Sequence, residues 1–311
     1  MDDYYDVYGH PKPGPYPTPT SATASTIPLP TVTGTPPQFE HIGAAGHRTL
    51  WVLFVLMLLS TISFIGIAWR VAIPKRLFYQ LTTYVLLVST ISYYAMATGG
   101  GWSIHRVWAT EGHKHDLPDT HHVVLQQVFW ARYVDWLVTT PIILFILGAV
   151  SGLSGSNILN LIVANVTMNL TVLFSTFSHH RKAKWGWYAM SWIAFAAVAW
   201  NLAVNARATA QRRGAQGVYN PLAIYTVVVW TTYVVIWGVG GLSRTLTPDG
   251  EAIAYAILDI LAKPVFGLWL LTSQGKVKEA EVHVDGVWSE GFGHREGLLR
   301  VGNGHGHDED A

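Results

Sequence analysis

Residues 252–275 read AIAYAILDILAKPVFGLWLLTSQG and hold two charged side chains, Asp259 and Lys263, in an otherwise apolar run. A transmembrane helix needs about 20 predominantly apolar residues, and this run is long enough to be one. A charge at membrane depth is costly and is kept where it pairs or performs a task. Because residues four apart share a helix face, Asp259 and Lys263 can pair there. The run therefore predicts a membrane-spanning helix that contains a buried ionic site.

Apolar runs of this kind recur along the chain, at residues 49–69, 77–98, 123–150, 155–178, 185–206, 219–243 and 252–275. A helix of a soluble protein would show an apolar stripe beside a charged face, and none of these runs does. The 311 residues are 50% hydrophobic and only 13% charged, whereas a soluble domain is about 25% charged. The predicted fold class is an all-α membrane protein, a bundle of seven transmembrane helices within the lipid bilayer.

The third run contains RYVDWLVTTP at 132–141, which places Arg132 and Asp135 on one helix face. With Asp259 and Lys263, they are the only Asp, Glu, Lys or Arg residues in the seven runs. These charges can neutralise one another only if the two helix faces meet inside the bundle. One interpretation is a structural ion-pair cluster. The other is a reactive site, because a desolvated lysine readily becomes the free amine that condenses with an aldehyde.

Aromatic side chains are dense in the same runs, and Trp230, Tyr233 and Trp237 form one stripe of the sixth. Such a stripe usually serves packing, but beside a buried amine it can also hold a long, flat, apolar ligand. The stretches RYVDWLVTTP and LDILAKPVFG resemble the third- and seventh-helix signatures of microbial rhodopsins. Over residues 48–275 the chain is similar to the fungal branch of that family.

The resemblance implies that all-trans-retinal is bound covalently to Lys263 as a protonated Schiff base in the core of the bundle. Asp135 would be the principal counterion and proton acceptor, and Asp259 the second carboxylate. Thr139, one turn after Asp135, is expected to hydrogen-bond that carboxylate. The implied proton path comprises Arg132, Thr139, Tyr93 and Glu251. The implied retinal pocket comprises Trp136, Thr140, Met168, Tyr188, Ser191, Trp230, Tyr233 and Trp237.

The sequence departs from proton-pumping relatives at Ile146. Eleven residues after the counterion, those relatives carry a carboxylate that reprotonates the Schiff base, and isoleucine carries no proton. Recovery of the dark state is therefore predicted to be slow. Glu251 matches one of two glutamates that such relatives use for proton release, while a solvated helix cap is its equally weighted alternative. Leu242 stands at the other glutamate position unless the loop aligns differently, which would bring Asp249 there.

The regions outside the runs are interpreted as tails. Residues 1–45 are rich in Pro, Ser and Thr and are predicted to be a disordered extracellular tail. The rhodopsin-like domain is predicted at 46–275, and 276–311 as a flexible cytoplasmic tail. Basic residues are divided almost equally between the two ends of the runs, so the positive-inside rule barely favours a cytoplasmic C-terminus. The resemblance implies the same orientation, in a multi-pass protein of the plasma membrane.

The leading functional hypothesis is a light-activated photoreceptor in which the Schiff-base proton moves to Asp135, with slow or residual outward proton transport. An efficient light-driven proton pump is the first alternative, and a retinal-free, opsin-related membrane stress protein is the second. Near-zero net charge argues against a nucleic-acid partner. No nucleophile–base pair or metal-ligand set lies in the bundle, so neither an enzyme nor a metal site is predicted. A homo-oligomer and a signalling partner are left open.

Overall fold

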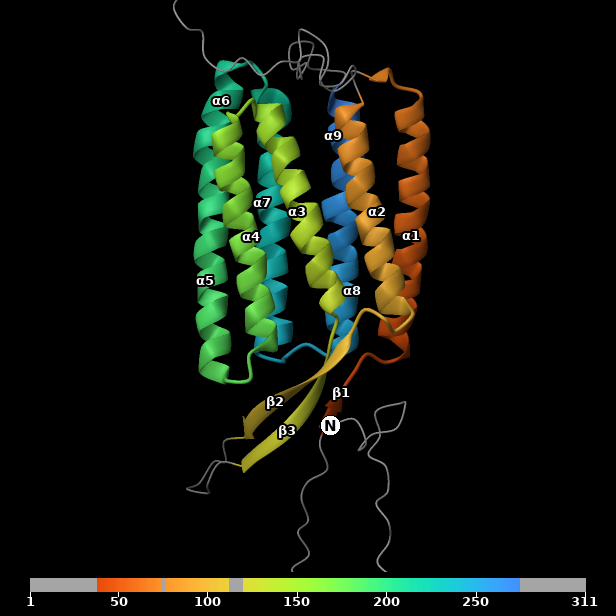
Figure 1. Ribbon diagram of the computed structural model, residues 1–311, viewed down its shortest axis with the longest axis vertical. Helices are drawn as coiled ribbons and strands as arrows, with labels where there is room; N and C mark the ends of the chain where they lie inside the picture. The colour runs from red at the N-terminus through yellow and green to blue at the C-terminus, as the bar shows by residue number, and fades with distance from the viewer. Residues whose placement is uncertain (1–37, 74–75, 112–119, 275–311) are drawn as a thin grey trace, which may run out of the picture. The chain divides into compact units, whose positions relative to one another are not determined.

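The computed structural model describes residues 38–73, 76–111 and 120–274. In these residues the chain forms seven helical rods (Figure 1). The first four are single helices, α1 (Ala44–Trp69), α2 (Leu77–Ala97), α3 (Trp130–Ser151) and α4 (Gly155–Phe177). The other three are continued through π-helical turns: α5 (Arg181–Trp200) with η2 (Asn201–Ala206) and α6 (Arg207–Arg212), α7 (Gln216–Trp237) with η3 (Gly238–Leu242), and α8 (Pro248–Ile260) with η4 (Leu261–Val265) and α9 (Phe266–Gln274).

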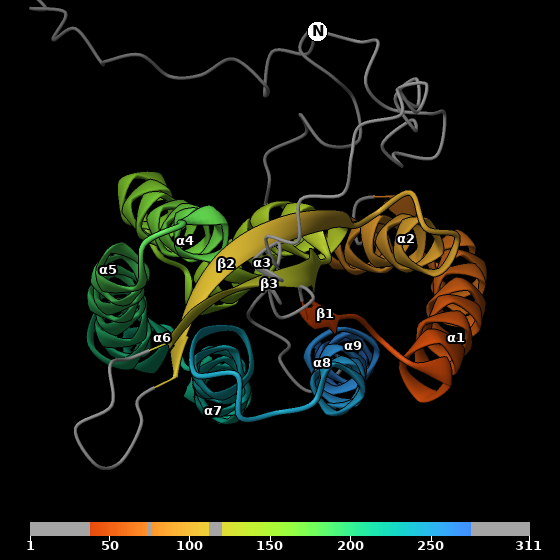
Figure 2. The same cartoon turned by 90° about the horizontal axis from the view of Figure 1, so that it is seen from below.

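Six of the rods are long and apolar enough to cross a membrane, judged by length and composition. The exception is α2, whose tyrosine, threonine and serine residues lower its mean hydropathy. It nevertheless packs between α1 and α3 as a full member of the bundle. Figure 2 shows the rods arranged as a ring, which closes where α8 packs against α1. Large aliphatic side chains such as Val52, Leu59 and Ile193 face outward, as expected for helices that contact lipid.

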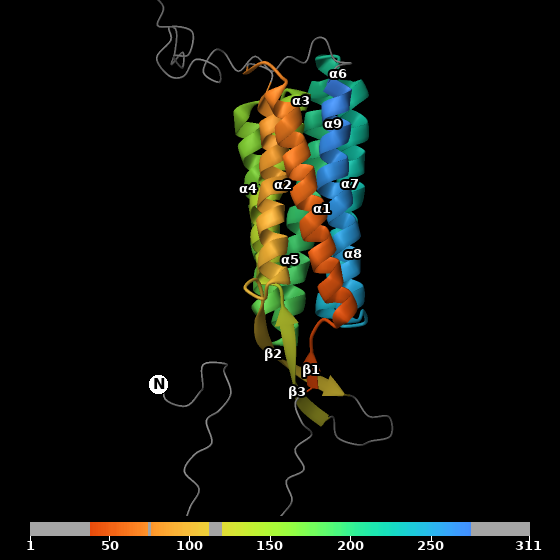
Figure 3. The ribbon, with the colours of Figure 1, turned by 90° about the vertical axis from the view of Figure 1, so that its right-hand side faces the viewer.

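A small sheet lies at one end of the bundle, which we call the sheet end (Figures 1 and 3). It contains β1 (Gln38–Glu40), β2 (Ser103–Glu111) and β3 (Thr120–Val128) in the order β1-β3-β2. The β2 and β3 strands form an antiparallel hairpin, and β1 runs parallel to β3. The antiparallel register places Val107 opposite Val124, with Val124 fully buried.

The helix predicted at 123–150 starts too early in the sequence. Residues up to Val128 belong to β3, and the helix begins only at Trp130. The stretch VVLQQV at 123–128 is short and apolar, and such a run is compatible with either a strand or a buried helix. The segment forms a strand because it pairs with β2. This pairing provides hydrogen-bond partners for its backbone N–H and C=O groups outside the helical bundle.

The predicted N-terminal tail ends earlier than residue 45. Residues 38–40 form β1, and α1 already begins at Ala44. The segment is held by Arg244, whose guanidinium pairs with the Glu40 carboxylate. Asp249 at the start of α8 also accepts hydrogen bonds from the amides of Gly43 (2.6 Å) and Gly46 (3.0 Å) at the start of α1. Residues 1–37 and 275–311, where most of both predicted tails fall, lie outside the described residues.

Candidate functional site

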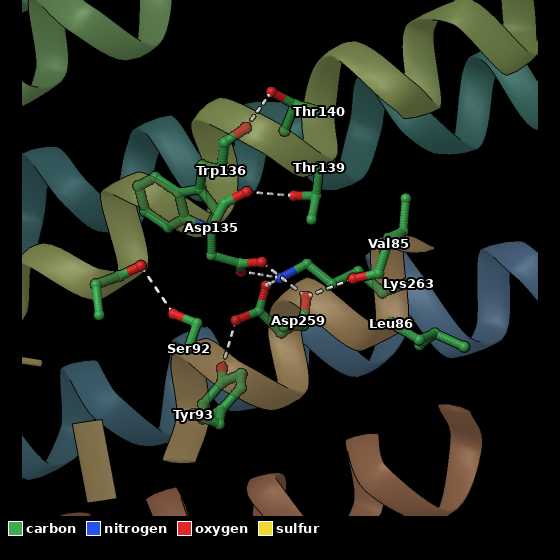
Figure 4. Close-up of polar contacts among 12 residues, drawn as sticks. Val85, Leu86, Ser92, Tyr93, Asp135, Trp136, Thr139, Thr140, Asp259 and Lys263 are labelled. Atoms are coloured by element: carbon green, nitrogen blue, oxygen red, sulfur yellow. Dashed lines mark hydrogen bonds and ion pairs between the residues drawn. The ribbon is translucent and has the colours of Figure 1, made fainter. Parts of the chain in front are cut away.

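The ammonium group of Lys263 lies between two carboxylates in the centre of the bundle (Figure 4). Its Nζ contacts Oδ2 of Asp135 on α3 and lies 2.8 Å from Oδ1 of Asp259 on α8. All three side chains are at most 2% exposed. The structure thus brings together one cation and two anions from the two charged runs, in direct contact and buried.

Hydroxyl groups from neighbouring helices hold the two carboxylates. Tyr93 of α2 donates to Oδ2 of Asp259, and Tyr233 of α7 donates to its Oδ1 at 2.7 Å. Ser89 of α2 donates to Oδ1 of Asp135 at 2.8 Å. No sequence motif singles out Ser89, although it lies one turn before Tyr93 and therefore on the same face of α2. Ionised carboxylates accept hydrogen bonds only, so these donors match the charged forms of both acids.

The prediction that Thr139 hydrogen-bonds the Asp135 carboxylate is wrong. The Thr139 hydroxyl donates instead to the backbone carbonyl of Asp135, at 2.8 Å (Figure 4). A threonine inside a helix readily bonds the carbonyl four residues earlier, while Lys263 and Ser89 already occupy the two carboxylate oxygens. Thr140 makes the same local bond to Trp136 and also donates to Asn165 of α4 at 2.7 Å.

Lys263 lies in the middle of η4, where the helix widens from an α- to a π-helical turn. The next residue is Pro264, which has no N–H to donate to the preceding turn. Single π-helical turns within α-helices are frequently found at functional sites. The local sequence therefore places the buried amine at an irregular turn of the seventh rod.

A cavity of about 560 Å³ extends from Lys263 between the helices. Its walls are mostly apolar, and they include six of the eight predicted pocket residues: Trp136, Thr140, Met168, Trp230, Tyr233 and Trp237. Thr139, predicted for the proton path, also lines the cavity, and the lining residues that the sequence did not predict are Ile143, Asn169, Val172, Val234 and Ala262. Several of these lie one turn from a predicted residue, as Val172 does from Met168, so helical periodicity was the available signal.

Tyr188 and Ser191, the other two predicted pocket residues, are not part of the cavity wall. The Tyr188 ring packs against Trp237, with 5.2 Å between ring centroids, and its hydroxyl donates to the Val234 carbonyl. Ser191 donates to the backbone carbonyl of Tyr188 at 2.8 Å. Tyr188 therefore supports Trp237 from behind, on the side of α5.

Arg132 is buried but does not touch the two carboxylates. Among the described residues it makes no ion pair, and its guanidinium lies over the Tyr255 ring, 4.3 Å from the centroid. Such a stacked arrangement is a favourable cation–π contact. The two helix faces do meet, because Asp135 and Asp259 both contact Lys263, but Arg132 stacks on Tyr255 and pairs with neither acid.

A second cavity, of about 510 Å³, lies on the far side of Arg132 toward the sheet end. We call it the sheet-end cavity, and its lining includes Arg132, Lys184 and Glu251 together with Gln126, Gln127, Val128, Phe129, Tyr133, Thr176, Trp237, Gly241, Pro248 and Ala252. Glu251 therefore faces the same space as Arg132, although they are on different rods. Leu242, the weighed second release position, is not in this lining.

Ile146 is fully buried in α3, between the buried residues Leu144 and Leu147. After Asp135, α3 has no further Asp, Glu or His up to its end at Ser151. Among the described residues, no group of three or more His, Asp or Glu side chains is placed to hold a metal ion. Five histidines, His105, His113, His115, His121 and His122, lie close together in the sequence between the second and third runs, and two of them, His113 and His115, are outside the described residues.

A bundle of seven helical rods with a lysine ion-paired inside it, at the end of an aromatic cavity, defines the class of retinal-binding membrane proteins. The sequence profile of the bacteriorhodopsin-like protein family matches residues 45–277, and the chain belongs to this family. Members of this family bind retinal through a Schiff base to a lysine. The protein is accordingly an integral, multi-pass membrane protein of the microbial rhodopsin family.

Fungal proteins are among the most similar relatives. Opsin-1 of Neurospora crassa is 42% identical over 276 residues, which cover 88% of this chain and 90% of Opsin-1. The crystal structure of LR (Mac), a light-driven proton pump from Leptosphaeria maculans, is 40% identical with a TM-score of 0.75, and the match covers 78% of this chain and 100% of that one. Halorhodopsin, a light-driven chloride pump, is 26% identical with a TM-score of 0.68, covering 78% and 100%.

Proposed function

We propose that Lys263 is the lysine that carries all-trans-retinal, and that the protein is a light-activated photoreceptor with slow or residual outward proton transport. One observation carries the first part: the Lys263 ammonium opens onto the apolar cavity and contacts both Asp135 and Asp259. An amine held in this way has a site for an apolar aldehyde on one side and counter-charge on the other.

The cavity fits the group that the family binds. Its walls are mostly apolar and carry few polar groups, as the walls of small-molecule sites do. Trp136 and Trp230 supply flat walls of the kind that a conjugated chain requires. When bound to Lys263, retinal supplies the absorption of visible light and a change of shape at the linkage on illumination.

The two carboxylates beside Lys263 accept different numbers of hydrogen bonds, and we assign them different roles on this basis. Two tyrosine hydroxyls stabilise the ionised form of Asp259, whereas a single serine hydroxyl serves Asp135. Hydrogen bonds to a charged carboxylate favour that charged form. Asp259 is therefore the permanent counter-charge, and Asp135 is the carboxylate that takes up the proton.

A proton on Asp135 leaves toward the sheet end in this proposal. Arg132 and Glu251 face the sheet-end cavity, and the positive charge of Arg132 couples the state of the inner carboxylates to Glu251. We place the sheet end and the N-terminus outside the cell and the C-terminus in the cytoplasm of a cell bounded by the plasma membrane.

The return of a proton to Lys263 is the slow step. Leu144, Ile146 and Leu147 are fully buried in the half of α3 beyond Asp135 and provide no acid or base. A general acid has to lie within hydrogen-bond reach, directly or through one water, to deliver a proton efficiently. Ile146 cannot do so, which supports a light-activated receptor that resets slowly rather than a pump with fast turnover.

The efficient-pump alternative is favoured by one observation: LR (Mac), at 40% identity, is itself a light-driven proton pump. Light-induced currents at zero membrane voltage, from retinal-loaded protein, separate the two functions. The proposal predicts a brief outward transient that decays under continuous light. A sustained outward current of constant amplitude would establish the pump. A coloured protein excludes the retinal-free alternative.

A further inference from the structure

The sheet-end cavity is bounded by the first turns of three helices. Arg132 lies in the first turn of α3, Lys184 in that of α5 and Glu251 in that of α8. The first N–H groups of a helix have no partner within it, and the N-terminus carries the positive end of the helix dipole. Three such ends around one cavity make its electrostatic potential positive before any side chain is counted.

Two buried cations add to this potential. Arg132 and Lys184 are each only 5% exposed. The Nε and Nη2 atoms of Arg132 are buried and have no hydrogen-bond partner among residues 38–73, 76–111 and 120–274. Within the described part of the chain, no carboxylate forms an ion pair with Lys184. Buried charges are ordinarily paired, but among the described residues neither cation has an ion-pair partner, and the Arg132 guanidinium also lacks hydrogen-bond acceptors.

The acids nearby do not balance the cations. Glu40 is already engaged by Arg244, whose Nε donates to it at 3.1 Å. Glu251 is the single carboxylate in the lining of the sheet-end cavity. Among the charged side chains that line the cavity, Arg132 and Lys184 leave one positive charge in excess when Glu251 is ionised and two when it is protonated.

We propose that the sheet-end cavity binds a small monovalent inorganic anion of chloride size, held between Arg132 and Lys184. Both side chains carry donors and no acceptor, so their common ligand has to be an acceptor. A single net positive charge fits a monovalent anion, and Glu251 on the wall disfavours a multivalent one. The site is independent of whether the protein transports protons.

The site also couples anion binding to Glu251. An ionised Glu251 repels the anion and a protonated one does not, so each ligand, proton and anion, favours the binding of the other. Anion affinity is therefore higher when Glu251 carries a proton. Replacing Glu251 with Gln, which is neutral at every pH, is expected to tighten anion binding.

The position of the site is tested by crystallography of the full-length, retinal-loaded protein grown with gluconate as the only small anion and then soaked in bromide. An anomalous difference peak in contact with both Arg132 and Lys184 supports the proposal. No peak in the cavity, or peaks confined to exposed surface cations, overturns it. Neither result depends on proton transport, so the outcome is separate from that of the proposed function.

The affinity is tested by thermal bleaching of the pigment in chloride against gluconate at constant ionic strength, because a ligand of the folded state raises the midpoint with its concentration. Lys184→Met removes one charged hydrogen bond and should weaken chloride binding about 10-fold or more. Lys182→Met is the matched control, since Lys182 is exposed and outside the cavity lining. It should leave chloride binding unchanged.

Lys184→Arg keeps the charge and should keep the chloride dependence, so it remains informative if Lys184→Met fails to fold. Glu251→Gln should lower the chloride concentration needed for half the effect. The proposal is wrong if Lys184→Met responds to chloride as the unmodified protein does, or if Lys184→Arg and the unmodified protein show no difference between chloride and gluconate.

Discussion

Ser89 of α2 donates a hydrogen bond of 2.8 Å to one oxygen of the Asp135 carboxylate, and Lys263 contacts the other. Both oxygens of this acid are therefore engaged, by a hydroxyl on one side and an ammonium on the other. This arrangement fixes the direction of the carboxylate, so that one oxygen faces the amine whose proton it is proposed to accept.

Asp135→Asn tests that role. An asparagine can still accept the bond from Ser89, but its amide takes up no proton at ordinary pH. We expect a coloured protein whose light-induced proton release is lost, measured as pH change in a suspension of vesicles. Asp259→Asn is the comparison, and it should retain some release because Asp135 is still present. Full release from Asp135→Asn would contradict the assignment.

Lys263→Ala should abolish visible colour, because it removes the proposed attachment point for retinal. Absorption spectra after addition of all-trans-retinal measure this directly. The change also leaves two buried acids without their cation, and breaking such a set costs about 3–5 kcal/mol. Circular dichroism must therefore show that the helices are retained. Lys182→Ala, on an exposed residue, should keep full colour; a coloured Lys263→Ala protein would refute the linkage.

Ile146→Asp should shorten recovery of the dark state by about 100-fold or more, the lower end of the range for a positioned general acid. Flash photolysis measures the recovery time. The matched control is Phe145→Asp, which adds the same acid one residue earlier on an outward face of α3, where the side chain is 36% exposed. Equal acceleration by both variants would show that position in the bundle interior does not matter.

Two glycines of α1 are expected to respond oppositely to alanine. At Gly46 a Cβ would lie 2.5 Å from Oδ1 of Asp249, so Gly46→Ala displaces the carboxylate that caps α1. Losing a cap costs about 0.5–2 kcal/mol. At Gly66 nothing lies within 4 Å, and Gly66→Ala should stabilise the helix by about 0.5–1 kcal/mol. Thermal bleaching midpoints report both; a fall with Gly66→Ala would contradict this account.

Burial lowers the pKa of His105 in β2 below its usual value, and the neighbouring His179 and Lys184 lower it further. The folded protein then binds this proton less tightly than the unfolded chain does. Stability from the neutral ring is fully present above the unfolded pKa of about 6.5 and is lost as pH falls below it. Bleaching midpoints should therefore fall from pH 7 to pH 5, and less so in His105→Gln. The exposed His47 provides the control: His47→Gln should leave the slope unchanged.

Much of the architecture could be predicted because the membrane makes charges rare. Asp135, Asp259 and Lys263 stand out in apolar runs, and helical spacing brings Trp136 and the Trp230 stripe to the cavity. Ser89 could not be found in this way, because serine is common in such runs and its role depends on which helix faces it. The direction of Arg132 was missed for a related reason: Tyr255, over which its guanidinium lies, belongs to another rod.

The hairpin shows a second kind of limit. Residues 123–128 have the composition of a helix interior as much as of a strand, and only their partner strand β2 decides between them. The N-terminal boundary likewise depends on residues more than 200 positions away, since Asp249 caps α1. Local pattern carries no information about such distant partners.

The π-helical turn at Lys263 has a mechanical consequence. Within that turn the Leu261 carbonyl accepts a hydrogen bond of 2.9 Å from the hydroxyl of Tyr225 on α7, whose ring also packs edge-on against Trp269. A hydrogen bond and an edge-on aromatic contact therefore join the seventh rod, near the lysine, to the neighbouring sixth rod. A displacement of the lysine backbone would therefore be transmitted to the sixth rod through Tyr225.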